Sequence, residues 1–476
     1  MSSYEFESLP KTAFGELQVA SMTPVIQITA QYGLRAEVES AAIGGTATAA
    51  DSKFIVSTGT GANNISSIGS TRLATYRAGQ GLLARYTALF TTGVANSSQV
   101  AGLLTSESII GFGYNGADFG ILHAKGGELE QWELQITAGA GVAENATITI
   151  DGNPYTVPFT AGVAGKNVYE AAVSLNSQVP GYGFSSHDDI LVCLAKLPDL
   201  GGGAFTFSSG TATGTFTKIK DGLLPPETWV NKADWNVNPN ININTTLGNV
   251  YQVQMQYLGF GGIKFYIEDP ETALFELVHI IKYANSSTIP SVSNPIFRIG
   301  WGVRNTGNTT DIIAQGASGA IFIEGEIVVD GASIGASQTQ TIGTIKTSVI
   351  SLQNRRTYYG AANRAEIIGR SLVLSTDTAK TAKFELILNP VVTVGEYLEF
   401  VDGGANSLGE LSRSAATITG GRVIAAYDVK AASPFKVDIG DVTSRLQPGD
   451  ILCVAAKVSS GAASEMSAAL TWQDDL

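Results

Sequence analysis

The sequence is poor in charged residues and in long apolar runs. Only 15% of its 476 residues are charged, well below the roughly 25% of an average soluble protein. The net charge is −13, and the nearest approach to a basic cluster is the isolated pair Arg355 and Arg356. Because phosphate neutralisation needs clustered Lys and Arg, no nucleic-acid partner is predicted. No apolar run approaches the roughly 20 residues of a membrane helix, so no membrane span is predicted either.

Cysteine and histidine are also scarce. Cys193 and Cys453 each lie in an apolar, strand-like run, which predicts two buried, unpaired thiols in a protein assembled in a reducing cytoplasm. With three histidines and no C-x-x-C pair, no metal site is predicted. The N-terminus has neither the basic nor the apolar region of a secretory signal.

Glycine is abundant, with 54 residues, and one stretch spells a known motif. Gly111, Gly113 and Gly116 match the dinucleotide fingerprint G-x-G-x-x-G. A pyrophosphate-binding loop must leave a strand and open a helix, whereas both flanks here are typical of strands. We interpret these glycines as turn and close-packing residues at a strand junction, where no Cβ is tolerated. No cofactor is predicted.

Period-2 alternation dominates the sequence. Gln252, Gln254 and Gln256, for example, fall on one face of a strand whose other face is apolar. Short strands separated by turn signals predict a mainly β protein built on a concanavalin-A-like jelly-roll sandwich. Further strands are expected at Leu82–Phe90, Ser108–Phe112, Leu129–Ile136, Ile263–Glu268, Leu274–Ile281, Ile296–Val303 and Ala320–Val329.

One stretch interrupts this pattern and suggests how the chain is divided. It contains a hairpin and one convincing helix, for which Asn167 is the expected N-cap, so we interpret it as an inserted ββαββ module, part of an α+β insertion. A polar Ser/Gln/Thr/Gly stretch downstream is typical of a linker. The predicted domains are an N-terminal extended or attachment segment (1–70), the jelly roll (71–136 with 223–330), the inserted module (137–222), the linker (331–344) and a C-terminal β-sandwich (345–476).

A row of carboxylates is the strongest candidate for catalysis. The E-x-E-x-x-E spacing of Glu128, Glu130 and Glu133 approaches the E-x-D-x-x-E of glucanases that have a concanavalin-A-like sandwich. Alternate carboxylates on a strand can face one cleft as nucleophile and acid, about 5 Å apart. The favoured alternative is a charged strand edge that faces solvent and resists aggregation. The sequence therefore predicts no enzyme, with glycoside hydrolysis kept as an alternative.

Five aromatic residues offer a candidate carbohydrate-binding surface, because ring stacking combined with amide hydrogen bonds is how lectin-like sites hold sugars. They lie close together in the sequence among many asparagines. Aromatic side chains in strands nevertheless belong to the core more often than not. The five are Trp229, Trp235, Tyr257, Phe260 and Tyr266.

Four segments carry a recognisable pattern of residues: Thr75–Gly81, Arg85–Thr91, Gly111–Leu122 and Tyr257–Glu268. They resemble segments of β-rich virion structural proteins from tailed bacteriophages, cyanophages among them, and from large DNA viruses. The resemblance extends from about Glu16 to Trp472. It implies a capsid-surface, tail or fibre-like component with a concanavalin-A-like jelly roll, and it supplies no catalytic residues.

The expected function follows from that resemblance. We expect a virion structural protein that is assembled in the host cytoplasm and resides in the virion. Its expected partners are other virion proteins and copies of itself in a homo-oligomer, with a trimer favoured. A host-surface glycan is a candidate partner. The alternatives are a carbohydrate-binding adhesin and a glycan depolymerase of concanavalin-A-like fold.

Overall fold

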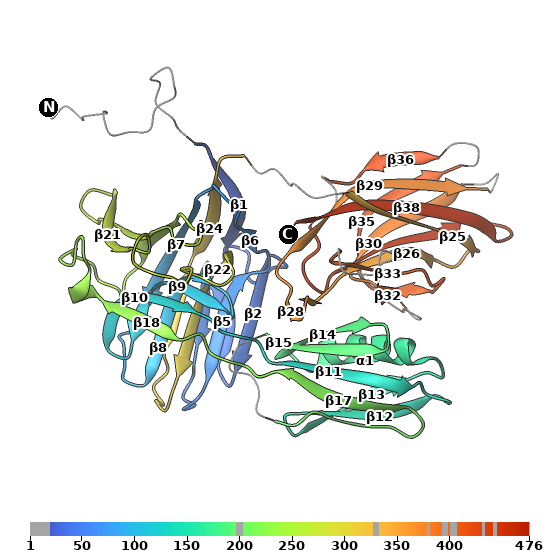
Figure 1. The fold of residues 1–476 in the computed structure, drawn as a ribbon. Helices are drawn as coiled ribbons and strands as arrows, with labels where there is room; N and C mark the ends of the chain where they lie inside the picture. Colours follow the sequence, from blue (N-terminus) through green and yellow to red (C-terminus); the bar gives the residue numbers. More distant parts are fainter. Residues whose placement is uncertain are drawn as a thin grey trace, which may run out of the picture.

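The computed structural model describes residues 20–196, 203–326, 333–377, 381–392, 398–399, 407–430, 434–440 and 445–475. These residues form three β-rich units that lie against one another (Figure 1). The prediction of a mainly β chain, with a jelly-roll sandwich, an inserted α+β module and a C-terminal β-sandwich, is confirmed. The exact division into domains remains a prediction.

The first unit is a sandwich of two antiparallel sheets. One sheet has the order β21 (Phe275–Ile281), β20 (Ile263–Glu268), β19 (Asn249–Met255), β7 (Leu82–Phe90), β23 (Ile313–Gly316), β4 (Lys53–Ser57), β3 (Thr46–Ala50), with β24 (Ser318–Glu324) also on β7 and β1 (Met22–Thr29) on β24. The other has the order β18 (Glu227–Asn231), β10 (Asp118–Lys125), β9 (Ser108–Asn115), β8 (Ser97–Leu104), β22 (Ile296–Asn305), β5 (Ile65–Ser70), β2 (Val38–Ile43), with β6 (Ala74–Thr75) on β22. A short 3-10 helix, η2 (Lys232–Asp234), follows β18.

Strand alternation explains how the core of this sandwich forms. In β22, Phe297, Ile299 and Trp301 are fully buried between the sheets, and the residues between them point to the outer face. Phe112 of β9 packs across the interface, with ring centroids 4.8 Å from Tyr251 and 5.6 Å from Phe265. Burial of these large rings supplies much of the stabilisation of the sandwich.

The glycine motif lies in a hairpin and contributes to strand packing. Gly111 and Gly113 are inside β9, and a Cβ on Gly113 would lie 1.8 Å from the carbonyl oxygen of Gln99 on β8. Gly116, with φ of 59°, makes the turn into β10. The close-packing interpretation is therefore confirmed for Gly111 and Gly113, whereas the turn interpretation applies to Gly116.

The second unit joins a four-stranded sheet, a three-stranded sheet and the single α-helix of the described residues. The sheet orders are β14 (Tyr182–His187), β15 (Ile190–Ala195), β11 (Gln131–Ala138), β17 (Thr213–Lys220) and β13 (Asn153–Phe159), β12 (Glu144–Ile150), β16 (Thr206–Ser208). The helix is α1 (Ala164–Gln178), and it buries Val168, Ala171 and Leu175 in the core of this unit. β11 pairs only within this unit, so the unit begins earlier than the predicted residue 137.

The predicted helix start is wrong by one turn. The N-cap is Val163, whose side chain makes no capping hydrogen bond, and Asn167 lies inside the helix. The Asn167 side chain instead accepts a hydrogen bond from Ala140 N at 2.8 Å and donates one to Thr160 O at 2.9 Å. The Asn167 side chain thus binds the backbone of neighbouring loops instead of capping the helix. Asparagine favours both kinds of backbone hydrogen bond, so its presence near a helix start did not identify the N-cap.

The third unit is a second sandwich, in which Trp472, Phe384 and Leu452 are buried between two antiparallel sheets. The sheet orders are β25 (Ser333–Ile342), β38 (Ser464–Asp475), β29 (Glu366–Thr376), β36 (Phe435–Asp438) and β32 (Leu398–Glu399), β33 (Gly409–Ser412), β26 (Thr347–Asn354), β37 (Ile451–Val458), β30 (Ala382–Leu388), β35 (Arg422–Val429). Two short ladders are β27 (Thr357–Tyr358) with β28 (Ala361–Ala362) and β31 (Val391–Val392) with β34 (Ile418–Thr419).

Two predicted segments without regular structure contain strands. In the expected linker, residues 333–342 form β25, which pairs with β38 along its whole length. In the expected N-terminal segment, β1 to β5 belong to the jelly-roll sheets, while residues 1–19 lie outside the described residues. Two of these strands, β3 and β25, consist mostly of Ser, Thr, Ala, Gly and Gln, so their alternation has too little hydrophobic contrast to be recognised as strand.

Candidate functional site

A cavity of about 410 Å³ lies where the three units meet. Its floor is the outer face of the eight-stranded jelly-roll sheet, and its sides are the β14 and β15 end of the second unit and loops of the third. Its volume falls within the roughly 300–1,000 Å³ typical of small-molecule sites. We name it the junction cavity.

The floor of the junction cavity follows from the strand alternation of β22. Phe297, Ile299 and Trp301 face the sandwich core, so Arg298 and Arg304 project to the opposite face and line the cavity. Ser67 of β5 and Leu122 of β10 line the same face. In this protein the other two units cover part of an outer sheet face that an isolated sandwich would expose to water.

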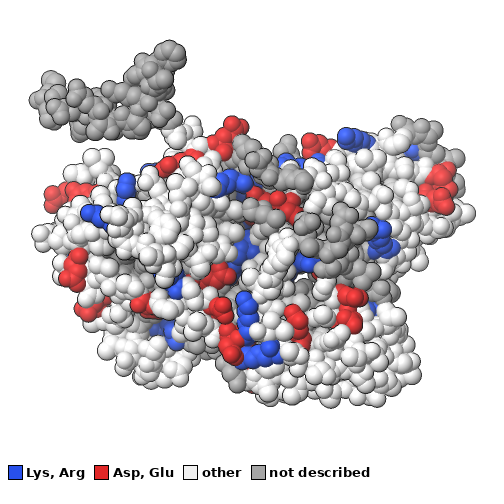
Figure 2. Space-filling model, viewed as in Figure 1, with Lys and Arg blue, Asp and Glu red and all other residues white. Residues whose placement is uncertain are grey.

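Basic side chains outnumber acidic ones around the cavity. This contrasts with the whole chain, where Asp and Glu outnumber Lys and Arg by 42 to 29, and with the face in Figure 2, on which uncharged residues predominate. Because low-dielectric walls strengthen electrostatic interactions, the cavity favours an anion. The basic lining residues are Lys196, Arg298, Arg304, Arg356 and Arg364, and the acidic ones are Glu39, Glu227 and Asp450.

Arg356 connects the second and third units at the cavity wall. Its guanidinium fits against two glycines, since a Cβ on Gly183 would lie 2.6 Å from Nη1 and one on Gly449 would lie 2.5 Å from Cζ. Nε donates to Phe184 O at 3.2 Å. Burial lowers the pKa of Arg356, although Glu39 and Asp450 oppose that effect. Burial also raises the pKa of the Asp450 carboxyl, an effect that Asn389 and Arg356 oppose.

Arg364 and Lys196 complete the basic wall. Arg364 Nη2 donates to the Ser106 hydroxyl of the jelly roll, and its Nε is buried without a hydrogen-bond partner among the described residues. Burial lowers the pKa of both Arg364 and Lys196. Nearby carboxylates oppose this effect, Glu39 for Lys196 and both Glu107 and Glu39 for Arg364.

One cation of the floor already has a strong partner. Arg298 Nη1 lies 2.6 Å from Glu39 Oε2, and the Arg298 charge is the main reason why the pKa of Glu39 is lowered. Glu39 thus neutralises part of the positive charge that lines the cavity. The remaining basic side chains of the lining are Arg304 of β22, Lys196 of the second unit, and Arg356 and Arg364 of the third unit.

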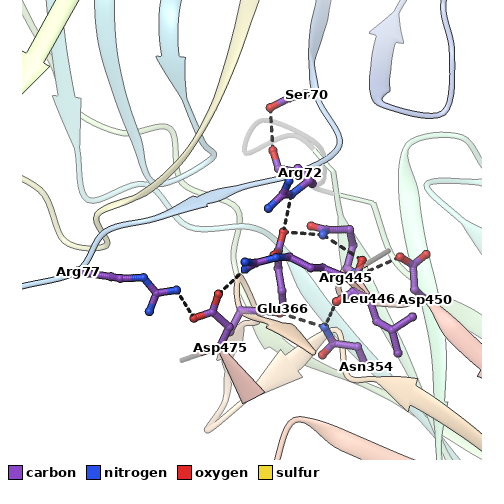
Figure 3. Close-up of polar contacts among 11 residues, drawn as sticks. Ser70, Arg72, Arg77, Asn354, Glu366, Arg445, Leu446, Asp450 and Asp475 are labelled. Carbon is purple, nitrogen blue, oxygen red and sulfur yellow. Dashed lines mark hydrogen bonds and ion pairs between the residues drawn. The ribbon is translucent and has the colours of Figure 1, made fainter. Parts of the chain in front are cut away.

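A buried polar network next to the cavity fixes the third unit to the jelly roll (Figure 3). Glu366 of β29, with 1% of its side chain exposed, lies 3.1 Å from Arg445 Nη1 and 3.5 Å from Arg72 Nε. Gln447 Nε2 donates to the same carboxylate at 2.7 Å. Asp475, 2% exposed, bonds Arg77 and Arg445 at 2.7 Å each. Arg72 and Arg77 belong to the first unit, so both carboxylates link two units.

A second polar cluster fixes the third unit to the second. Glu410 of β33 is buried, lies 2.5 Å from His187 Nδ1, and accepts a hydrogen bond from Gln353 Nε2 at 3.3 Å. The hydroxyl of Tyr169 on α1 accepts a hydrogen bond from Val392 N at 3.0 Å. Burial raises the pKa of Tyr169 to about 12, so this hydroxyl stays neutral. Such contacts define one relative position of the two units.

The structure places the three predicted carboxylates in different environments. Glu128 is exposed, Glu133 is half-buried on β11, and Glu130 is fully buried. Glu130 accepts a hydrogen bond from the Tyr182 hydroxyl at 2.6 Å and pairs with Lys218 at 3.0 Å. The expected arrangement, with alternate carboxylates facing one open cleft, is not present among these residues. Glu130 does not lie on a solvent-facing charged edge, because its side chain is buried and is bound by Tyr182 and Lys218 inside the second unit.

The five predicted aromatic residues also separate. Trp229 is half-buried, lines the junction cavity, and donates from Nε1 to Glu227 Oε2 at 2.7 Å. Trp235 is a core residue, 3% exposed, with its ring centroid 5.8 Å from Phe112.

The other three aromatic residues lie elsewhere on the first unit. Tyr257 packs edge-on against Tyr76, and Tyr266 bonds Gln254 Oε1 at 3.3 Å. Phe260 is 40% exposed in the loop before β20. The structure therefore does not gather the five into one surface.

The cavity arginines were missed because they are far apart in the sequence. Their one visible signal was the pair Arg355 and Arg356, of which the second reaches the cavity. Cys193 and Cys453 are buried and unpaired, as predicted, and burial raises the pKa of both thiols. In the described ranges no group of three or more His, Cys, Asp or Glu residues could hold a metal ion, and no helix is long and apolar enough to span a membrane.

Comparisons with known proteins give only distant structural similarity. No protein-family model and no curated protein matches the chain. The metal-free carbohydrate recognition domain of Emp46p has 10% identity and a TM-score of 0.25 over 61% of this chain and 89% of its own. The lectin from Bauhinia forficata in complex with GalNAc has 8% identity and a TM-score of 0.24 over 64% of this chain and 98% of its own. A chain of Sulfolobus Turreted Icosahedral Virus has 10% identity and a TM-score of 0.17 over 98% and 99%. Scores this low carry no argument about function.

Proposed function

We propose that this chain is a structural protein of a virus particle, in the capsid surface, tail or a fibre-like component, and that it resides in the virion after assembly in the host cytoplasm. The resemblance of its four sequence segments to β-rich virion proteins motivates the proposal. The observation that carries it is the buried polar junction, in which Glu366, Asp475 and Glu410 link the three units. Units joined by small interfaces move relative to one another by default. A building block needs one fixed shape instead.

The experiment is to purify particles of the virus that encodes this chain and to locate it in them. We expect the chain at a constant copy number per particle, bound by a specific antibody at a defined position seen by electron microscopy. Position would distinguish capsid decoration from a tail or fibre. Presence in infected-cell extract together with absence from purified particles would overturn the proposal.

We also propose that copies of the chain assemble with one another, with a trimer favoured. Leu258 and Ile289, exposed by 69% and 63%, lie in loops that are joined by the bond from Ser291 N to Gly259 O. With Phe260 they present apolar surface at one end of the jelly roll, as association surfaces do. Light scattering of the purified protein should give roughly three times 49.7 kDa. A monomeric mass at micromolar concentration contradicts this proposal.

A second candidate function is binding of a host-surface glycan at the junction cavity. Trp229 favours it, because a half-buried indole at the edge of a cavity that also holds hydrogen-bonding groups is suited to stack against a sugar ring. A glycan array should show binding by the full chain that is lost in Trp229→Ala. Tyr32→Ala is the matched control, since Tyr32 is an aromatic residue of the first unit that is 70% exposed and does not line the cavity. Equal loss in both variants, or no binding at all, contradicts the candidate.

We propose no enzymatic function. The depolymerase alternative would use Glu130, which is fully buried and engaged by Tyr182 and Lys218. The full chain should leave a panel of polysaccharides intact. Degradation that is abolished in Glu130→Gln, with the fold retained by circular dichroism, would overturn this expectation.

A further inference from the structure

Five basic and three acidic side chains line the junction cavity. Of its five basic side chains, Arg298 has a close carboxylate in Glu39. Arg364 Nε is buried without a hydrogen-bond partner among the described residues. A desolvated guanidinium is unfavourable unless an acceptor completes its hydrogen bonds. Arg364, which lines the cavity, therefore has one N–H group that lacks an acceptor among the described residues.

Two other cations, Arg356 and Lys196, line the same cavity. Arg356 is fixed between Gly183 and Gly449 by close packing, so its planar fork is already oriented. Lys196 is exposed at the end of β15 and lines the same cavity. A fixed arginine with a mobile lysine at the rim is suited to receive a carboxylate or a sulfate that arrives from solvent.

The cavity also offers uncharged surface for the rest of a ligand. Leu104, Ile109 and Leu122 form an apolar floor, and Trp229 presents its ring beside them. Ser67, Ser98 and Ser106 supply hydroxyl groups on the same face. A bare inorganic anion would leave this surface unused, whereas a sugar has both apolar faces and hydroxyl groups.

We propose that the junction cavity binds an acidic saccharide, with Arg356, Arg364 and Lys196 holding its oxyanion and Trp229 stacking on its ring. This inference rests on the glycan-binding candidate above and names the class of sugar. It also gives the cavity a reason to lie between units, because the ligand contacts all three. Occupancy would then stabilise the arrangement in which the units meet.

The experiment is isothermal titration calorimetry of the full chain with three probes: digalacturonate, the neutral digalactose of the same linkage, and inorganic sulfate. We expect digalacturonate to bind at least about tenfold more tightly than digalactose, equivalent to about 1.4 kcal/mol. Lys196→Met should weaken digalacturonate about three- to tenfold and leave digalactose unchanged, as expected for loss of one rim charge. Lys436→Met is the matched control on β36, outside the cavity lining, and should bind like the parent.

Each outcome bears on a different part of the reasoning. Equal binding of the two disaccharides overturns the acidic specificity and leaves the glycan candidate standing. Sulfate binding as tight as digalacturonate overturns the saccharide part. No binding of either disaccharide overturns both this inference and the glycan candidate, while the particle-location experiment still tests the structural role. Arg364→Gln could disturb the contact with Ser106, so Lys196→Met, which breaks no such contact, is the decisive variant.

Discussion

Removal of the Glu366 carboxylate should destabilise the attachment of the third unit. Glu366 is 1% exposed and is bound by Arg445, Gln447 and Arg72. Loss of one partner from a buried ion pair costs about 3–5 kcal/mol, because it leaves an uncompensated charge in the interior. Arg72 is 44% exposed and Arg445 keeps Asp475 at 2.7 Å. Both facts favour the lower end, about 3 kcal/mol.

Hydrogen exchange followed by mass spectrometry is the suitable assay. A single unfolding midpoint is poorly defined for a chain of several units, whereas exchange reports opening of each strand separately. For Glu366→Ala, about 3 kcal/mol corresponds to a roughly 150-fold larger opening constant for amides of β29 and β38. Amides of the second unit should be unaffected, because their hydrogen bonds lie in other sheets.

The matched control is Glu385→Ala, which also removes a paired glutamate of the third unit. Glu385 lies 3.0 Å from Lys346, but both side chains are partly exposed. A pair of this kind contributes about 0–1 kcal/mol. If Glu366→Ala changes exchange no more than Glu385→Ala, the reasoning that burial makes the Glu366 network structurally important is refuted.

Four further predictions follow from single side chains. His123 is buried, donates a hydrogen bond from Nε2 to the carbonyl oxygen of Ser291 at 2.7 Å, and has its pKa lowered by burial. The unfolded chain therefore binds more protons than the folded chain below about pH 6.5, and stability should fall as the pH drops through that value. The thermal midpoint should fall less between pH 7.5 and pH 5 in His123→Gln than in the parent protein. An identical fall in both proteins contradicts the role of His123 in this pH dependence. Gly113→Ala should give little folded protein in a solubility assay, because the new Cβ would clash with the Gln99 carbonyl oxygen. Gly248 has open space around it, so Gly248→Ala should express normally. Equal yields of the two variants would falsify the close-packing argument. Trp235→Ala should lower the opening free energy of amides in the first unit, measured by hydrogen exchange, by about 3–5 kcal/mol, as for other buried aromatics. An effect below about 1 kcal/mol would place Trp235 outside the core. Cys193 and Cys453 should react with a thiol reagent only after unfolding, because burial raises the pKa of both thiols; fast labelling of the native protein contradicts their burial.

The sequence was most informative where apolar and polar residues alternate strongly. Leu82–Phe90 and Ile263–Glu268 are strands with the predicted bounds, because each has a clear buried face. Thr46–Ala50 and Ser333–Ile342 are strands as well. Small and polar residues predominate in both, so the partner strand determines their structure and no local signal does.

The candidate site was less predictable than the fold. Trp229 was among the predicted binding residues, and it lines the cavity. Trp235 belonged to the same prediction but lies in the core. The sequence around an aromatic residue does not show whether other elements of the fold cover its side chain. Arg298, Arg356 and Arg364 come from two units, and only the packing of those units brings them to one cavity. The spacing of these arginines in the sequence does not predict that they line one cavity.

The pairing of β1 with β24 has a consequence for synthesis on the ribosome. The Thr23 hydroxyl bonds the carbonyl of Gly325, 302 residues further along the chain, and β1 pairs with β24 over its whole length. At about 5–20 residues per second, roughly 15–60 s of translation separate the two strands. The second unit emerges completely within that interval. A nascent chain that stops between residues 220 and 318 therefore contains all strands of the second unit but lacks β24 in the first sheet. It exposes an unpaired strand edge, which favours aggregation.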